Sequence, residues 1–314
     1  MTTYGQFRLA AINAAPVYFD REASTEKACR LILEAGASGA TLAAFGETWL
    51  PGYPFHIWRE VPTALRVEYI ANAVEIPSPT TDRLCAAARQ ANIDVVIGVV
   101  ELDAQTHGTV YCTLLFIGSD GSILGRHRKI KPTFVERTAW GEGDGSSLIV
   151  YERPYGKISG LCCWEHNMVL PGYALMAQGT QIHIAAWPGW ESTRHLLLSR
   201  AFASQAAAYV IDVGAIVNRD DLREDYQALI AGSYWGGSCI INPEGEVIAG
   251  PAKSETILVA DCSTEQIFSS KVLCDVGGHY SRPDIFQLHV NRKPYQRIVE
   301  TNNPHPAPIE FDYR

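Results

Sequence analysis

The sequence of 314 residues carries little charge and has no segment suited to crossing a membrane. Its longest stretch without Asp, Glu, Lys or Arg, residues 166–190, contains two prolines and several polar residues, so it does not form a membrane helix. Charged residues make up 19% of the chain, and the net charge of −8 disfavours binding to nucleic acid or to anionic membranes. The 47% of hydrophobic residues suffices for a sizeable core.

Several common catalytic and cofactor signatures are also missing. The chain has no Walker loop and no Gly-x-Ser-x-Gly elbow of a serine hydrolase. The glycines at 141–145 read as a loop and not as the strand-to-helix turn of a nucleotide fingerprint. None of the eight cysteines belongs to a Cys-x-x-Cys pair, so they read as reduced thiols and not as zinc ligands. We therefore expect no metal and no organic cofactor.

The start of the chain gives an expectation about location. Residues 1–8 lack the basic flank and the apolar stretch of a signal peptide. Reduced cysteines are typical of the cytoplasm, because secreted proteins usually pair theirs in disulfides. We expect a cytoplasmic protein.

Strand-like and helix-like segments alternate along the chain, which predicts a single layered α/β domain. Helical spacing of apolar residues predicts helices at 24–35, 80–91, 172–178 and 194–208. Apolar and β-branched runs predict strands at 7–17, 41–45, 93–100, 111–117, 122–127, 158–163, 181–186, 209–217, 238–242, 246–249 and 256–261. Three prolines near the end favour an extended arm, so we expect a domain over 1–290 and an arm over 291–314.

Three segments contain side chains suited to catalysis. In the first, the apolar strand at 158–163 ends in Cys162 and Cys163, and strand ends are where active sites of α/β folds usually form. In the second, Glu47 directly follows a buried strand among aromatic residues, where desolvation would raise its pKa and make it a base near neutral pH. Taken singly, each feature is more often structural, as a packed thiol or a capping carboxylate.

The third segment, residues 125–137, is basic in an otherwise acidic chain. A solvated loop is the ordinary interpretation, and the segment is too short for a nucleic-acid surface. A buried lysine paired with a carboxylate is the alternative, because an ammonium group can stabilise charge that develops on a substrate atom. Lys129, Lys131 and Glu136 are the candidates for such a pair.

Taken together, these segments resemble the signature regions of the nitrilase (carbon–nitrogen hydrolase) superfamily, and of its nitrilase branch in particular. The resemblance rests on Phe-Gly-Glu-Thr-Trp-Leu-Pro-Gly-Tyr-Pro at 45–54, His-Arg-Lys-Ile-Lys-Pro-Thr at 127–133, Trp-Gly-Glu-Gly-Asp-Gly at 140–145, Cys-Trp-Glu-His at 163–166 and Gly-His-Tyr-Ser-Arg-Pro-Asp at 278–284. Each motif alone is weak, but their order and spacing are specific and span nearly the whole chain.

The resemblance implies a four-layer α-β-β-α sandwich and a set of catalytic residues. It implies that Glu47 is the general base, Lys129 the stabilising cation and Cys163 the nucleophile, with Glu136 as the family's second glutamate. Because adjacent strand residues face opposite ways, only one of the two neighbouring cysteines is expected to face the pocket, and Cys162 is expected to be a packed neighbour.

The implied reaction hydrolyses an organic nitrile to a carboxylic acid and ammonia through a thioimidate and a thioester on Cys163. An amidase or carbamoylase using the same residues on an amide is the nearest alternative, and cyanide dihydratase is a narrower one. A Cys163–His166 dyad and a catalytically silent assembly protein are more remote.

The remaining expectations concern the pocket and the assembly. Aromatic residues near the motifs are candidates for an apolar substrate-binding wall, namely Trp49, Tyr53, Trp140, Trp164, Trp187 and Trp190. The expected partner is a small nitrile, with no nucleic acid and no membrane. Members of the resembling family often form dimers and spiral oligomers, so a homo-oligomer is expected through the helices at 172–178 and 194–208.

Overall fold

The computed structural model describes residues 5–59, 62–189 and 192–299, and it contains two six-stranded sheets. The first sheet has the order β14-β1-β2-β3-β4-β5, made of Thr256–Ser263, Gln6–Asn13, Leu42–Ala44, Asp94–Leu102, Val110–Ile117 and Ile123–Arg128. The second has the order β13-β12-β9-β8-β7-β6, made of Val247–Ala249, Cys239–Ile241, Tyr209–Gly214, Ile182–Trp187, Gly156–Cys162 and Tyr151–Arg153. A small third sheet pairs β10 (Ile216–Val217) with β11 (Tyr234–Trp235).

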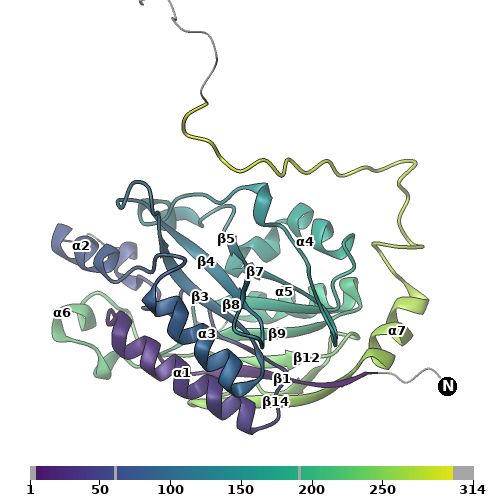
Figure 1. The fold of residues 1–314 in the computed structure, drawn as a ribbon, viewed down its shortest axis with the longest axis horizontal. Helices are drawn as coiled ribbons and strands as arrows, with labels where there is room; N and C mark the ends of the chain where they lie inside the picture. Colours follow the sequence, from purple (N-terminus) through teal and green to yellow (C-terminus); the bar gives the residue numbers. More distant parts are fainter. Residues whose placement is uncertain (1–4, 60–61, 190–191, 300–314) are drawn as a thin grey trace, which may run out of the picture.

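Three apolar clusters divide the molecule into four layers (Figure 1). The central cluster takes side chains from both large sheets, so the sheets pack face to face. The second joins the outer face of the first sheet to α1 (Arg21–Ala37) and α3 (Pro79–Ala91). The third joins the second sheet to α4 (Val169–Met176) and α5 (Thr193–Ala206). This is the expected four-layer α-β-β-α sandwich.

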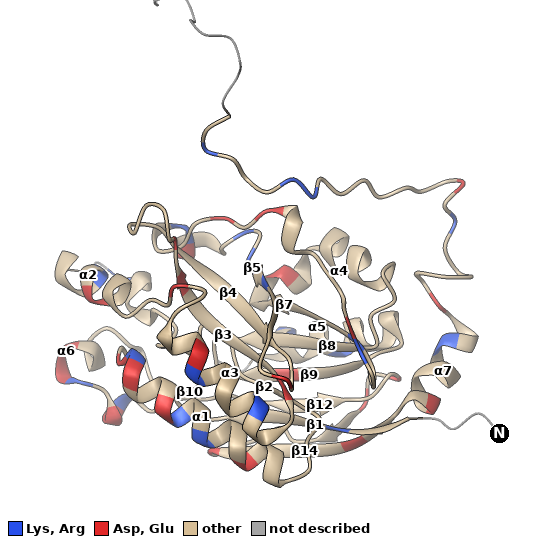
Figure 2. Ribbon diagram, viewed as in Figure 1, with Lys and Arg blue, Asp and Glu red and all other residues tan. Residues whose placement is uncertain are grey.

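Helix α1 illustrates how the sequence produces these layers. Asp20 caps it by accepting a hydrogen bond from the Ala23 N–H group. Ala28, Leu31 and Ile32 are buried against the sheet, whereas the helix also carries both acidic and basic residues along its length (Figure 2). No helix within the described ranges is both long enough and apolar enough to span a membrane.

Several elements differ from the expectation. The strand expected at 209–217 is split, because the chain leaves the sheet after Gly214 and Ile216–Val217 pair with β11 instead. Helix α4 starts at Val169 and not at residue 172. Pro171 is tolerated in its first turn, because the N–H group that a proline lacks would have no intrahelical partner there. The expected strand at 158–163 ends one residue early, at Cys162. The sequence reading missed three helices, α2 (Thr63–Ala71), α6 (Glu224–Gln227) and α7 (Thr264–Leu273).

The strand directions bring the three signature segments to one end of the sandwich. Strands β1, β2 and β3 are parallel, β5 runs in the same direction as β3, and β7, β8 and β9 are parallel in the second sheet. Residue 47 follows β2, residue 129 follows β5 and residue 163 follows β7. The described part of the tail, residues 291–299, contains no helix or strand, and residues 300–314 of the expected arm lie outside the described residues.

Candidate active site

Four side chains from distant parts of the chain meet between the two sheets. The Lys129 Nζ atom lies 2.6 Å from Glu47 Oε1 and 2.7 Å from Glu136 Oε2. One carboxylate oxygen of Glu47, one of Glu136 and the Cys163 sulfur lie within 4.8 Å of one another. Each of the four residues is at most 2% exposed. The structure therefore brings together the four residues that the sequence motifs single out.

Glu47 is held by the turn that follows β2. Its N–H group donates to the Trp187 carbonyl at 3.0 Å, which ties this turn of the first sheet to the end of β8 in the second. The Cys112 thiol donates to Glu47 Oε1 at 3.2 Å. The other oxygen, Oε2, is buried and has no hydrogen-bond partner among the described residues. That oxygen is available to accept a proton.

The two neighbouring cysteines belong to different apolar clusters, yet both lie near Glu47. Cys163 is the first residue of a 3₁₀ helix (Cys163–Asn167) and has a φ angle of 49°, in the left-handed region. Side-chain alternation applies only inside a strand, and the strand ends at Cys162. The sulfurs of the strand residues Cys162 and Cys112 also lie within 4.8 Å of a Glu47 oxygen. Cys162 is packed in the core, as expected, but it borders the site as well.

Burial and charge set the protonation states of these groups. Burial raises the pKa of Glu47 to about 7, although the adjacent Lys129 ammonium opposes the rise. Burial alone would lower the pKa of Lys129, but the charge of Glu47 and the other acidic groups raises it well above its ordinary value. Burial, followed by the charge of Glu47, raises the pKa of the Cys163 thiol well above its ordinary value. At neutral pH the site thus holds a cationic lysine, a neutral thiol and a carboxylate near its titration midpoint.

Glu136 is fixed by three donors in addition to its place in a 3₁₀ helix (Phe134–Thr138). Its Oε2 accepts from Lys129 and from the Thr133 N–H group at 2.6 Å, and its Oε1 accepts from the Tyr53 hydroxyl at 2.8 Å. Lys131, by contrast, pairs with Glu142 at the surface, where both side chains are nearly half exposed. Only one of the two candidate lysines thus lies in the site.

The expected aromatic wall divides into residues that reach the charged cluster and residues that do not. Tyr53 contacts Glu136, and Lys129 Nζ lies 5.3 Å from the centre of the Trp140 ring. The Trp49 and Trp187 rings are buried in the outer apolar clusters and donate to the Ala14 carbonyl and the Ser199 hydroxyl. Trp164 is 40% exposed and lies beside the Arg194 guanidinium group. Trp190 lies outside the described residues.

The Cys163–His166 dyad is wrong for this structure. The His166 Nδ1 atom lies 2.7 Å from the Cys163 carbonyl oxygen, and its Nε2 atom lies 3.0 Å from His183 Nε2. Both ring nitrogens are therefore engaged away from the thiol.

The sequence reading also missed Cys112, His127 and Glu165. Cys112 contacts Glu47 from β4, and nothing in its local sequence marks that contact. His127 and Glu165 each stand two residues from a catalytic candidate, on strand β5 and in the 3₁₀ helix after β7, and that spacing was the available signal. They form a buried pair 3.0 Å apart.

The cluster has the ligand types of a metal site, but an ammonium group occupies its centre. Glu47, Glu136 and Cys163 offer three ligand atoms. Lys129 Nζ already makes short ion pairs with both carboxylates, so part of their negative charge is offset where a cation would bind.

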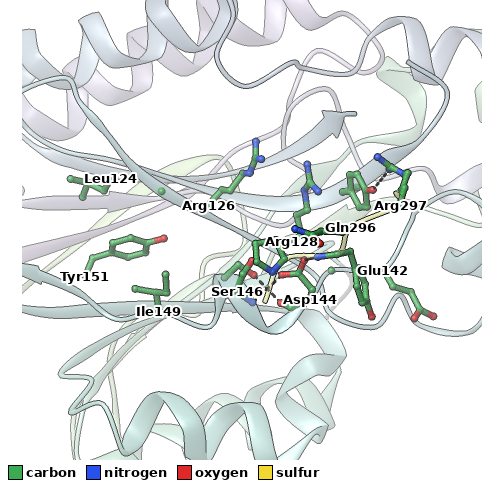
Figure 3. Close-up of a pocket in the computed structure, with 16 residues that line it drawn as sticks. Leu124, Arg126, Arg128, Glu142, Asp144, Ser146, Ile149, Tyr151, Gln296 and Arg297 are labelled. Carbon is green, nitrogen blue, oxygen red and sulfur yellow. Dashed lines mark hydrogen bonds between the residues drawn. The ribbon is translucent and has the colours of Figure 1, made fainter. Parts of the chain in front are cut away.

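A separate cavity of about 630 Å³ lies along β5, the loop at 142–149 and the tail (Figure 3). Its three arginines are already paired: Arg126 and Arg128 with Glu101, and Arg297 with Asp103. None of the four clustered residues lines it. The chemistry therefore lies with the buried cluster and not with this cavity.

Comparisons with known proteins agree with the motifs. The family model described as "Carbon-nitrogen hydrolase" matches residues 8–271. A protein named Nitrilase 2, from an unknown prokaryotic organism, is 55% identical over 95% of this chain and 97% of its own length. An aliphatic nitrilase from Rhodococcus rhodochrous is 37% identical over 91% of this chain and 83% of its own length. The crystal structure of Saccharomyces cerevisiae Nit3, at 20% identity, covers 88% of this chain and 96% of its own with a TM-score of 0.71, which shows the shared fold.

The paired lysine yields a prediction about stability. Replacing Lys129 with Met leaves two buried carboxylates without a cation, and breaking a buried pair costs about 3–5 kcal/mol. The matched control is Lys131→Met two residues away, where loss of an exposed pair changes the free energy of unfolding by at most about 1 kcal/mol. Urea unfolding at neutral pH measures both, and equal effects would contradict the buried-charge account.

Proposed function

The chain belongs to the carbon–nitrogen hydrolase family, and from this premise we propose that it is a nitrilase. It hydrolyses an organic nitrile to the carboxylic acid and ammonia, with Cys163 as nucleophile, Glu47 as general base, and Lys129 and Glu136 as supporting charges. The observation that carries the proposal is the cluster itself, in which one buried ammonium group joins two carboxylates beside a buried thiol.

The first half of the reaction consumes the nitrile and one water. Glu47 accepts the thiol proton as the Cys163 sulfur attacks the nitrile carbon, because the raised pKa of the thiol leaves it protonated at rest. Lys129 stabilises the charge that develops on nitrogen, and proton transfer to that nitrogen completes a thioimidate. Water, deprotonated by Glu47, adds to the thioimidate carbon, and ammonia leaves, so that a thioester remains on Cys163.

The second half releases the acid. Another water, again deprotonated by Glu47, attacks the thioester carbon, and the C–S bond breaks to give the carboxylic acid and the free thiol. Glu47 serves as base in all three steps, and its pKa of about 7 suits a group that must take and return a proton near neutral pH. Glu136 holds Lys129 charged and in place throughout.

The nucleophile assignment is tested by a pair of neighbouring variants. Cys163→Ala should lower kcat for nitriles by on the order of 10⁴-fold or more, since it removes the atom that forms the covalent intermediate. Cys162 borders the same glutamate, but the Cys162→Ala variant should retain most activity. It should lose about 1–2 kcal/mol of stability, because core packing is lost.

Ammonia and acid release should be measured for arylacetonitriles, short dinitriles and cyanide, beside the matched amides. Fast amide turnover with inert nitriles would replace the nitrilase proposal with an amidase. If Cys162→Ala is inactive and Cys163→Ala is active, the nucleophile must be reassigned to Cys162.

The acid limb of the pH profile should report Glu47. As a base it must be deprotonated, so kcat/KM should rise about tenfold per pH unit below pH 7 and level off above it. The negative charge of Glu136 helps to raise that pKa, so Glu136→Gln should move the limb to lower pH. The exposed Glu142→Gln serves as control and should leave the limb in place. A limb that stays near pH 7 in Glu136→Gln would contradict the coupling.

We also propose that the enzyme assembles as a homo-oligomer in the cytoplasm. Val169, Leu170 and Leu197 are 80%, 63% and 62% exposed on helices α4 and α5, which favours a partner on this face. All eight cysteines are free, which suits a reducing compartment. Sedimentation velocity should give a dimer or a larger species that Leu197→Glu weakens, and a monomer at micromolar concentration would overturn the assembly.

A further inference from the structure

One buried carboxylate accepts hydrogen bonds from the backbone at the end of a strand in each of the two sheets. Glu165 Oε2 accepts from the Cys162 N–H group at 2.7 Å, and Glu165 Oε1 accepts from the Ile130 N–H group at 2.8 Å. Cys162 directly precedes Cys163, and Ile130 directly follows Lys129. A single side chain, 1% exposed, thus contacts the main chain next to the nucleophile and next to the cation.

The hydrogen bond from Ile130 crosses from one sheet to the other, whereas the bond from Cys162 is local to the end of β7 and caps the 3₁₀ helix that follows it. Cys162 is the last residue of β7 in the second sheet, and Ile130 lies just beyond the end of β5 in the first. Glu165 belongs to the 3₁₀ helix that follows β7, so its position is fixed by the chain segment that carries Cys163. The carboxylate therefore spans the gap between the sheets at the level of the site.

His127 completes the arrangement from the first sheet. Its Nε2 atom lies 3.0 and 3.2 Å from the two Glu165 oxygens, and its Nδ1 atom lies 3.2 Å from the Ser147 hydroxyl. Burial would raise the pKa of Glu165, but the charge and hydrogen bond of His127, with the two backbone donors, lower it. The carboxylate is thus ionised and has donors on both oxygens, as a buried charge requires.

We propose that Glu165, held by His127, is a positioning residue that fixes the distance between Lys129 and Cys163. The inference rests on the nitrilase activity proposed above. Lys129 and Cys163 reside on different sheets, and a displacement of about 1 Å between reacting groups costs on the order of 100-fold in rate. Glu165 contacts the main chain one residue from each of them, so it limits that displacement directly.

The proposed positioning role of Glu165 requires a carboxylate and not an amide. Both oxygens face N–H donors, so Glu165→Gln would direct an NH₂ group at the Cys162 amide or at the Ile130 amide, whichever way the side chain is flipped. One of the two backbone hydrogen bonds, either the local bond to Cys162 or the cross-sheet bond to Ile130, is then lost and replaced by a repulsive contact. The substitution leaves the volume of the side chain almost unchanged, so it isolates the hydrogen bonds.

Asp94→Asn provides a matched control. Asp94 is 1% exposed, and it too links the sheets, because it accepts from Arg153 of β6 at 2.7 Å and from the Ser119 N–H group at 2.7 Å. It is the first residue of β3, at the end of the sheet opposite to Glu47. Asp94→Asn should lower the free energy of unfolding by a comparable amount without changing the site.

The test compares steady-state kinetics of wild type, Glu165→Gln and Asp94→Asn on the best nitrile, with activities normalised to folded protein. We expect Glu165→Gln to lower kcat about 10- to 100-fold with KM within about threefold, and Asp94→Asn to keep kcat within twofold. If Glu165→Gln does not fold, Glu165→Asp retains the charge but is one methylene shorter, and a fall in kcat of about tenfold is expected.

Three results would overturn the positioning role of Glu165 while leaving the nitrilase proposal intact. One is a kcat within twofold of wild type in the folded variant, and another is a change confined to KM. The third is an equal fall in kcat for Asp94→Asn, which would mean a general response to losing a buried carboxylate. Wild-type protein that turns over no nitrile would instead reject the proposed function.

Discussion

The shared ion pair of Lys129 is the interaction on which the rest of the site depends. Three ionisable groups are buried together, and such burial is tolerated only because the ammonium group contacts both carboxylates. The same contact limits how far desolvation raises the pKa of Glu47 and leaves it near 7. Charge neutralisation and base strength therefore have one structural origin.

The two-sheet architecture explains how such a cluster can be built from distant segments. The first sheet supplies Glu47 and Lys129, and the second supplies Cys163, each just after a strand whose direction brings it to the same end of the sandwich. Strand ends leave the main chain free to turn, as the left-handed backbone of Cys163 illustrates. The sheets provide rigidity, and the residues just beyond them provide the chemistry.

Sequence reasoning succeeded where order and spacing along the chain carry the information. Glu47, Lys129, Glu136 and Cys163 were singled out as one set by their motifs, and the four layers followed from the family resemblance. It failed where contacts depend on the third dimension. Cys162, at the end of its strand, and Cys163, in the turn after it, both lie near Glu47, and Trp49 and Trp187 pack into outer clusters, where their ring nitrogens find partners. Local sequence encodes neither the backbone angle nor those partners.

The neutral resting state of the Cys163 thiol has a consequence for its resistance to oxidation. Peroxides and other oxidants attack thiolates far faster than thiols, and exposed thiolates are the usual targets. Here the sulfur is 2% exposed and its pKa is raised, so it becomes strongly nucleophilic only when Glu47 takes the proton. Burial and protonation therefore both protect this sulfur from oxidants until a substrate arrives.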